Sequence, residues 1–460
     1  MIVMKFGGTS VEDAEAIRNA SRIVAQRLNR KPLVVASACA GVTNELVDLA
    51  KSACSGTSGR AMEIVEQLRF KHRQIAEELF SGDLRHTIQS QIDALYDVLR
   101  DLARSIAILG ELTNRSLDTF MSFGEKVSTM LLHHRLVQEG VLSVLVNAQE
   151  VIVTNDDFTR ALPLVDQIED RARKILKPKI DAGRVVVTQG FLGATVSGIP
   201  TTIGRGGSDY SAALLGAALD AEEIQIWTDV DGVMTCDPSI IKEARLIQEL
   251  TFHEAAELAY FGARVLHPAT ILPAIQKNIP VRVLNSKRPE IQGTLILRDV
   301  RTPSRFPVKA IAYKRHITLI NIESTRMLMM HGFLAKVFEV FAKYEKSVDV
   351  IATSEVSLSL TVDSDENLDA IFNELQMIAD VQVSHGKAVF CVVGEDLKNA
   401  RGVITRIFST LDKHDIGVGL ISLGASEINV TFVVGERDVK RTAQALHDEF
   451  LRVSRVPTDH

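Results

Sequence analysis

The stretch Thr201-Thr202-Ile203-Gly204-Arg205-Gly206-Gly207-Ser208-Asp209-Tyr210 runs directly into the apolar sequence Ala212-Ala213-Leu214-Leu215. Its glycines let backbone N–H groups approach a ligand closely, and the helix expected after them directs unpaired N–H groups toward the same point. Arg205 adds a forked donor for a carboxylate or phosphate, and Asp209 can receive an amine or a metal. The stretch predicts an anion site at a helix start; the alternative is a plain tight turn capped by Ser208.

Short apolar runs alternate with helical patterns on both sides of this stretch, up to about residue 300. Continuous apolar runs are typical of strands buried on both faces, which favours an α/β/α sandwich on a largely parallel sheet. Residues 60–140 have helical spacing without a convincing strand, so we expect a helical excursion there. The predicted strands are residues 2–6, 33–37, 143–147, 184–189, 224–228 and 281–284.

A charged linker with two prolines, residues 298–307, precedes a C-terminal part that repeats itself. Gly332 and Gly402 each open a helical pattern that leads into a strand, a Ser-Glu pair and an alternating strand, and a further helical pattern follows. We therefore expect an α/β domain at residues 1–300 and two ferredoxin-like βαββαβ units at residues 301–385 and 386–460. Such units pair through their sheet edges, which favours a homo-oligomer.

Composition excludes several classes of partner. The chain has 460 residues, 46% of them hydrophobic, and a net charge of −6, which argues against nucleic acid or an anionic membrane as a partner. It has no apolar run of membrane-spanning length and no signal-peptide pattern, so a cytoplasmic location is expected. The four cysteines are scattered, which indicates neither a disulfide framework nor a zinc site, and no protein-held metal is predicted.

A second candidate site is Lys5-Phe6-Gly7-Gly8-Thr9-Ser10, where a lysine near the end of the first predicted strand precedes two glycines. Backbone N–H groups and a cation suit a polyphosphate. The patterns G-x-x-x-x-G-K-[ST] and G-x-G-x-x-G are absent, which disfavours the common nucleotide-binding folds. Taken alone, Lys5 is better explained as a solvated lysine at a strand end.

Together, the Lys5 and Gly204 segments resemble the amino acid kinase family, and further segments narrow the resemblance to its aspartate-kinase branch. These segments are residues 37–44, 122–128, 188–191, 227–232 and 261–268, which occur in the family's order over nearly the whole chain. The C-terminal repeat resembles the paired ACT domains of the same branch. The combination is highly specific.

The resemblance implies ATP-dependent phosphorylation of L-aspartate to 4-phospho-L-aspartate, the first step of lysine, threonine and methionine biosynthesis. It implies Mg²⁺ held mainly by the nucleotide phosphates, feedback inhibition by lysine through the ACT units with threonine as the alternative effector, and a homodimer or homotetramer. Two other readings stay open. One is a kinase for another acidic amino acid, and the other is a catalytically weakened amino-acid-binding sensor.

The resemblance also assigns residues to four sets. The catalytic set is Lys5, Gly8, Arg205 and Asp209. The aspartate-binding set is Ser37, Thr43, Glu125, Phe191, Arg205, Gly206, Gly207, Ser208 and Asp209. The nucleotide-binding set is Lys5, Gly7, Gly8, Thr228, Asp229, Met234, Ser239, Arg264 and Val265. The effector-binding set is Met327, Met330, Gly332, Phe333, Leu334, Val348, Asp349, Ser354 and Glu355.

Within these sets, Arg205 suits the α-carboxylate of aspartate, and Asp209 and Glu125 suit its α-ammonium. Glu125 lies beside an apolar helical stripe, so a capped or ion-paired carboxylate near a core is its alternative role. The sequence departs from some relatives at three nucleotide positions: Met234 replaces a tyrosine, Ser239 a basic residue, and Arg264 a lysine. These departures leave the geometry of nucleotide contact open.

Overall fold

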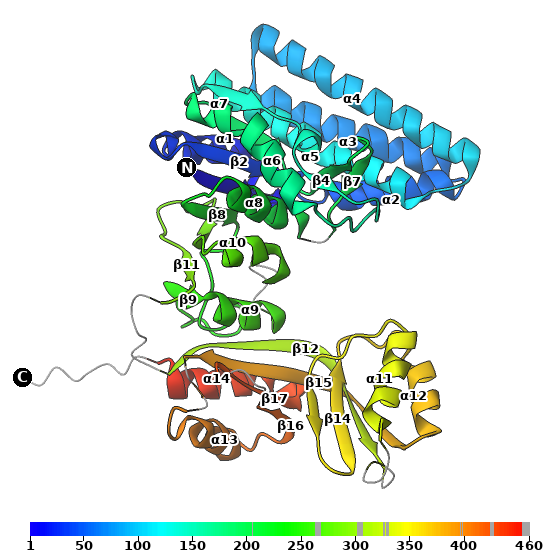
Figure 1. The fold of residues 1–460 in the computed structure, drawn as a ribbon, viewed down its shortest axis with the longest axis vertical. Coiled ribbons are helices and arrows are strands. Elements are labelled where there is room, and N and C mark those ends of the chain that lie inside the picture. The colour runs from blue at the N-terminus through cyan, green and yellow to red at the C-terminus, as the bar shows by residue number, and fades with distance from the viewer. Residues whose placement is uncertain are drawn as a thin grey trace, which may run out of the picture. The chain divides into compact units, whose positions relative to one another are not determined.

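The computed structural model describes residues 1–204, 206–262, 268–300, 307–324, 327, 331–395, 397, 399–423 and 427–452. The chain divides into two compact units (Figure 1). The first is built from residues 1–233, 248–252 and 265–300, and the second from residues 234–247, 253–264 and 301–460. Within the described residues, no helix has the length and hydropathy needed to span a membrane.

The first unit is organised around an eight-stranded sheet whose strand order is β3-β5-β2-β1-β8-β10-β11-β9. All pairs are parallel except β10 with β11, and every predicted strand is present. The strands are β1 (Ile2–Phe6), β2 (Pro32–Ala36), β3 (Ser143–Leu145), β5 (Val185–Gln189), β8 (Glu223–Thr228), β9 (Glu249–Thr251), β10 (Val281–Asn285) and β11 (Thr294–Leu297). The predicted α/β class on a largely parallel sheet is confirmed, whereas β9 and β11 were not predicted.

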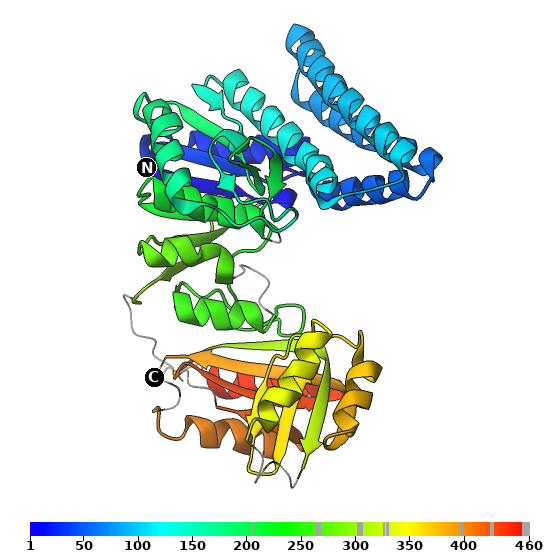
Figure 2. The same ribbon diagram turned by 45° about the vertical axis from the view of Figure 1, so that its right-hand side comes forward.

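Helices cover both faces of this sheet. Alternate β1 residues Ile2, Met4 and Phe6 join a core with α1 and α5, whereas Val3 lies against Gly216 of α8. The expected helical excursion is confirmed as a hairpin of α3 and α4, which run side by side away from the sheet (Figure 2). The helices of this unit are α1 (Ala14–Ala25), α2 (Val42–Cys54), α3 (Ser58–Leu79), α4 (Gly82–Leu109), α5 (Asn114–Gln138), α6 (Val165–Ile175), α7 (Lys177–Asp181), α8 (Gly207–Ala218) and α10 (Leu272–Gln276).

A small three-stranded sheet, which was not predicted, precedes the glycine-rich turn. It consists of β4 (Val153–Thr154), β6 (Leu192–Thr195) and β7 (Pro200–Thr202), in the order β4-β6-β7. The Thr154 and Thr201 hydroxyls lie 2.7 Å apart, and the Ala161 N–H donates to the Thr202 carbonyl at 2.9 Å. These bonds fix the backbone that enters the turn.

The second unit contains a six-stranded antiparallel sheet in the order β13-β14-β12-β15-β17-β16. Its strands are β12 (Val308–Glu323), β13 (Ile351–Thr353), β14 (Ser357–Val362), β15 (Asp380–Gly394), β16 (Val418–Ser422) and β17 (Asn429–Gly435). Its helices are α9 (Phe252–Tyr260, whose first residue belongs to the other unit), α11 (Phe333–Lys343), α12 (Leu368–Gln376), α13 (Val403–Lys413) and α14 (Val439–Phe450). Short 3₁₀ helices in the two units are η1 (Gly8–Ser10), η2 (Leu28–Arg30), η3 (Ala148–Glu150), η4 (Pro268–Ile271) and η6 (Glu436–Asp438).

The two apolar cores of the second unit share the long strands β12 and β15. Ile320 and Ile322, in the second half of β12, belong to the core with α11 and α12. Val308 and Ile311, in the first half, belong to the core with α13 and α14. The core with α13 and α14 therefore includes a strand segment that precedes, in sequence, the core with α11 and α12. The predicted domain limit at residues 385 and 386 falls inside β15. The cores are not two consecutive segments of chain.

The only tryptophan of the chain, Trp227, is fully buried near the end of β8. Its ring stacks on Phe6 of β1 with ring centroids 6.0 Å apart, and the Arg27 guanidinium lies 4.7 Å from its ring centroid. The indole Nε1–H donates to Gln225 Oε1 at 3.2 Å, and the Trp227 carbonyl accepts the Gly7 N–H at 2.9 Å. Both ends of this residue are thus held.

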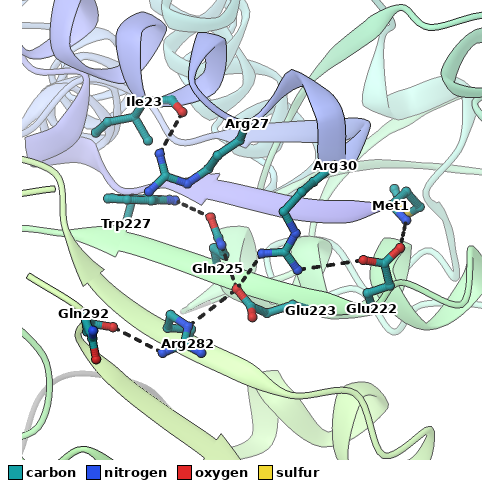
Figure 3. A network of polar contacts seen from close by, with 10 residues as sticks. All are labelled: Met1, Ile23, Arg27, Arg30, Glu222, Glu223, Gln225, Trp227, Arg282 and Gln292. Carbon is teal, nitrogen blue, oxygen red and sulfur yellow. Dashed lines mark hydrogen bonds and ion pairs between the residues drawn. The ribbon is translucent and has the colours of Figure 1, made fainter. Parts of the chain in front are cut away.

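Glu223, near the start of β8, lies at the centre of a charge network (Figure 3). Its Oε1 accepts from Gln225 Nε2 at 2.6 Å and lies 3.5 Å from Arg30 and 3.6 Å from Arg282. The neighbouring Glu222 pairs with the N-terminal ammonium at 2.7 Å, yet its side chain is 63% exposed, against 12% for Glu223. The network joins α1, η2, β8 and β10 through a mostly buried carboxylate.

We expect Glu223→Ala to lower the free energy of unfolding by about 1–3 kcal/mol, because the change removes a shared partner of two arginines. Urea unfolding followed by Trp227 fluorescence measures this loss in the first unit. The matched control is Glu222→Ala, for which the exposed ion pair predicts a loss of about 0–1 kcal/mol. Equal losses in the two variants would contradict the role given to the network.

Candidate active site

Ser37, Phe191 and Asp229 follow strands β2, β5 and β8, and Lys5 lies near the end of β1. These four neighbouring strands end at the same edge of the sheet. The turns after these strands are joined by backbone hydrogen bonds. The Gly190 N–H donates to Ala36 at 2.9 Å, and the Ser37 N–H donates to Phe6 at 3.0 Å. The bond from Gly7 to the Trp227 carbonyl continues the series. The edge therefore presents a fixed row of turns, the usual place for a ligand in an open α/β sheet.

Lys5 and Asp209, which the sequence assigned to different substrates, form an ion pair in the structure. The Lys5 Nζ lies 2.7 Å from Asp209 Oδ1, and the two side chains are only 11% and 16% exposed. Asp209 lies in the first turn of α8, after Gly206 in the left-handed conformation at φ 74°. A mostly buried cation and the N-terminal end of a helix therefore meet at one point, which suits an anionic group.

Close packing at this point requires glycine. A Cβ atom on Gly207 would lie 2.6 Å from the Phe191 ring, and one on Gly190 would lie 2.6 Å from the Ser208 side chain. Phe191 itself has φ 65°, a costly conformation for a non-glycine residue, and its N–H donates to Ser211 Oγ at 3.0 Å. The start of α8 is therefore seated tightly against the turn after β5.

Glu125, on α5, is a buried carboxylate with an exposure of 2%. Burial raises its pKa to about 7, although the Ala38 N–H acts against this increase. Its Oε2 has no hydrogen-bond partner among the residues that the structure describes. A Cβ on the adjacent Gly124 would lie 2.6 Å from Ala38, so this part of α5 is pressed against the turn after β2. The carboxylate is suited to a cationic group of a ligand.

The structure brings most of the predicted aspartate and phosphate contacts to this edge. Ser37, Phe191 and the Thr228-Asp229 pair follow β2, β5 and β8, and Thr43 lies in the first turn of α2. Met234 and Ser239 belong instead to the second unit, where Met234 bridges to Leu246. Four predicted residues lie outside the described residues: Arg205, Arg264, Val265 and Met330. The roles of all these residues remain predictions.

The predicted effector residues fall into two groups. Gly332, Phe333 and Leu334 begin α11, and Met327 lies shortly before them. Ser354 and Glu355 follow the end of β13, whereas Val348 and Asp349 precede its start. The Asp349 N–H donates to Thr361, and the Ser354 N–H donates to Ser357. These two partners on β14 are separated by about 13 Å along the strand. Asp349 and Ser354 are therefore not adjacent in one chain.

The Asp349 carboxylate already has partners in the structure. It accepts the Tyr260 hydroxyl at 2.7 Å and lies 3.3 Å from Lys314 Nζ, with a side-chain exposure of 5%. Neither Tyr260 nor Lys314 was predicted from the sequence. Both are distant in sequence from Asp349, which was assigned from the family resemblance, so no local sequence signal connects them with it.

A buried polar residue near the site was also missed. Asp118, on α5, is fully buried and accepts hydrogen bonds from the Thr159 N–H, the Thr202 N–H and the Thr202 hydroxyl. Burial raises its pKa, against the effect of these donors. The available signal was a carboxylate next to Leu117 on an apolar helical stripe.

Metal ligands do not gather in the described part of the chain: no group of at least three His, Cys, Asp or Glu side chains is placed to hold an ion there. The charged groups at the edge are instead the Lys5 ammonium and the Asp209 carboxylate, at the N-terminal end of α8. This set fits a nucleotide that carries its own metal on its phosphates.

Known proteins agree with this arrangement. The model of the amino acid kinase family matches residues 1–285, and an ACT domain model matches residues 390–450. The chain is 39% identical to lysine-sensitive aspartokinase 3 of Escherichia coli (strain K12), over 97% of this chain and 98% of that protein. It is also 39% identical to the chloroplastic aspartokinase 3 of Arabidopsis thaliana, over 100% of this chain and 84% of that protein.

Solved structures give the same result. Aspartokinase III of E. coli in complex with aspartate and ADP, in the R-state, has a TM-score of 0.82 and 38% identity, covering 98% of this chain and 99% of that one. The T-state of that enzyme with lysine and aspartate has a TM-score of 0.83 at 38% identity, covering 98% and 100%. With its fold, its turns and these relatives in agreement, the chain belongs to the amino acid kinase family, in the aspartokinase branch.

Proposed function

We propose that this chain transfers the γ-phosphoryl group of ATP to the side-chain carboxylate of L-aspartate, giving 4-phospho-L-aspartate and ADP. The observation that carries the proposal is the buried Glu125 carboxylate beside the turn after β2, at the edge where Lys5 and the start of α8 also meet. An amino acid substrate supplies the cation that this carboxylate needs. The complex of the E. coli relative with aspartate and ADP supports the same choice of ligands.

The reaction needs no general base. An aspartate side chain has an ordinary pKa of about 3.9, so its carboxylate is already a nucleophile at neutral pH. A carboxylate oxygen forms the new bond to the γ-phosphorus, while the bond to the bridging oxygen of ADP breaks and its electron pair leaves with ADP. The obstacle is the repulsion between two anions, and the protein must supply positive charge and alignment.

Lys5 and the Gly7 and Gly8 turn supply that charge. In the structure the Lys5 ammonium pairs with Asp209 at 2.7 Å. When aspartate binds, its α-ammonium takes over Asp209 and Glu125, and Lys5 becomes available to the transferring phosphoryl group. Arg205 binds the α-carboxylate through its two-pronged guanidinium in this proposal. The substrate therefore replaces one ion pair with another and does not leave a buried charge unpaired.

The nucleotide contacts stay a proposal based on the family resemblance. In this proposal ATP binds to Thr228 and Asp229 at the end of β8, and also to Met234, Ser239, Arg264 and Val265. Mg²⁺ bound to the nucleotide phosphates neutralises part of their charge.

Lysine regulates the enzyme through the first core of the second unit, with Asp349 receiving its side-chain ammonium in this proposal. The naming of the E. coli relative as lysine-sensitive supports the choice of lysine over threonine. Lysine must then compete with Tyr260 and Lys314 for the Asp349 carboxylate. Because Asp349 and Ser354 lie at opposite ends of β13, we further propose that a second copy of the chain completes the site, as a homodimer or homotetramer.

Hydroxamate formation in hydroxylamine, with ATP and Mg²⁺, tests the reaction, with aspartate and glutamate offered in separate assays. Product with aspartate is expected, and none with either amino acid would refute the kinase.

Lys5→Ala should lower kcat by about 100-fold or more, because a cation aimed at the developing charge is lost. The KM for aspartate should change less than about fivefold. Normal turnover with a raised aspartate KM would contradict the phosphate role of Lys5.

The pKa of Glu125, which burial raises to about 7, predicts a pH dependence of substrate binding. Only the ionised carboxylate attracts the α-ammonium, so kcat/KM for aspartate should fall about tenfold per pH unit below 7. The measurement uses saturating ATP with Mg²⁺. Glu125→Gln should have a lower kcat/KM for aspartate and should not show this fall below pH 7. If the fall came from protonation of ATP, it would persist in Glu125→Gln.

The raised pKa of Glu125 also predicts how the free energy of unfolding changes with pH. Burial raises the pKa of Glu125, so the folded state holds a proton more tightly than the unfolded state. Its contribution to stability is full below the ordinary pKa of about 4.5 and is lost as the pH rises through 7. Urea unfolding above pH 7 should therefore show Glu125→Gln to be more stable than the parent chain, and a less stable variant would contradict the assignment.

Asp349→Asn should raise the lysine concentration for half-inhibition by about tenfold or more, because the amide forms no ion pair with the effector. Activity is titrated with lysine and, in parallel, with threonine. Asp363→Asn is the matched control, since Asp363 also pairs with Lys314, at 2.9 Å, but lies outside the predicted effector set. Unchanged inhibition in Asp349→Asn, or inhibition by threonine alone, would overturn the assignment.

A further inference from the structure

Asp118, near the start of α5, accepts three hydrogen bonds from residues that are distant in sequence. Its Oδ2 accepts the Thr159 N–H at 2.9 Å and the Thr202 N–H at 3.1 Å, and its Oδ1 accepts the Thr202 hydroxyl at 2.6 Å. The side chain is fully buried. Helix α5 is thereby bonded to two segments of chain that are far from it in sequence.

These two segments flank the glycine-rich turn. Thr202 ends β7, and the next residue, Ile203, donates its N–H to the Phe191 carbonyl at 3.1 Å. Thr159 has φ 72°, a conformation that a threonine adopts only at a cost, and its carbonyl lies 3.5 Å from where a Gly204 Cβ would be. Asp118 therefore holds Thr202, which shortly precedes Gly204 in sequence, and the Thr159 segment, which lies close to Gly204 in space.

Helix α5 carries the other substrate contact. Glu125 follows Asp118 by seven residues, which places both carboxylates on the same side of the helix, separated by about 10 Å along its axis. One rigid helix therefore bears the proposed partner of the α-ammonium and the anchor of the turn with Asp209. The distance between the two halves of the aspartate site depends on this anchor.

We propose that Asp118 is a positioning residue for the reaction, which holds the start of α8 at Gly206–Asp209 at the correct distance from Glu125 for aspartate to bridge them. This inference rests on the proposed function. Asp118 touches no substrate and acts only through Thr159 and Thr202. The competing explanation is a purely structural role, in which loss of Asp118 lowers stability and nothing else.

Steady-state kinetics separate these explanations. Asp118→Ala should raise the KM for aspartate by about 10- to 100-fold, the factor for losing hydrogen bonds to a charged group, and leave the KM for ATP within about twofold. Asp118→Asn should stay within about fivefold of the parent, because the amide oxygen still accepts both N–H groups and the Thr202 hydroxyl can rotate to accept from its NH₂. If any substitution at this position acted only by lowering stability, Asp118→Asn would not restore the KM for aspartate.

The matched control is Leu132→Ala, also fully buried on α5 but within the apolar core. It should lower stability through a cavity and leave the aspartate KM unchanged. If Leu132→Ala raises the aspartate KM as much as Asp118→Ala does, the positioning role is wrong.

Should the alanine variant fail to fold, Thr202→Val removes one of the three bonds and should raise the aspartate KM about threefold or more. No increase there would overturn the proposal.

Amide hydrogen exchange gives a readout that needs no substrate. Exchange at the Thr159 and Thr202 N–H groups should become faster in Asp118→Ala and stay unchanged in Leu132→Ala. If the parent chain does not phosphorylate aspartate, the proposed function fails while this measurement still decides whether the tether exists. Faster exchange together with an unchanged aspartate KM would show a tether without a positioning role, and slow exchange in Asp118→Ala would refute the tether itself.

Discussion

The parallel pairing of β5, β2, β1 and β8 is the constraint on which the first unit depends. Because these strands end at one edge, their turns can bond to one another, as Gly190, Ser37 and Gly7 do. The pairing also brings Lys5 of β1 beside Asp209 of α8, although roughly two hundred residues separate them in sequence. A phosphate site and an amino acid site can share this edge only because the strand order makes their turns neighbours.

The buried charged groups at this edge differ in whether they have a charged partner. Lys5 and Asp209 form an ion pair, whereas Glu125 has an oxygen without a hydrogen-bond partner among the described residues and a pKa near 7. A buried carboxylate that is costly without a cation reduces stability and favours an ammonium ligand at the same time. This is the usual compromise of an active site: folding tolerates a poor environment for one group because the substrate improves it.

Much of the fold could be predicted from the sequence because its main signals are local. Buried parallel strands such as β1 and β8 are continuous apolar runs, and the glycines before α8 mark a tight turn. The small sheet of β4, β6 and β7 could not be predicted, since its strands are short and pair over long separations in sequence. Asp118 was missed for a related reason. A carboxylate on an apolar helix face has a definite role only once its partners, Thr159 and Thr202, are known.

The shared strands of the second unit affect how this half of the protein can be divided. The first half of β12 pairs with the second half of β15, where Lys314 lies opposite Val389 and Ile317 opposite Lys387. Cutting the chain near residue 385 would leave the C-terminal core without the β12 strand that it needs. Joining Lys314 to Lys387 by a short hairpin turn would instead excise the core with α11 and α12 and keep the other core whole. The core with α11 and α12 is thus inserted, in sequence, within the strands of the other core.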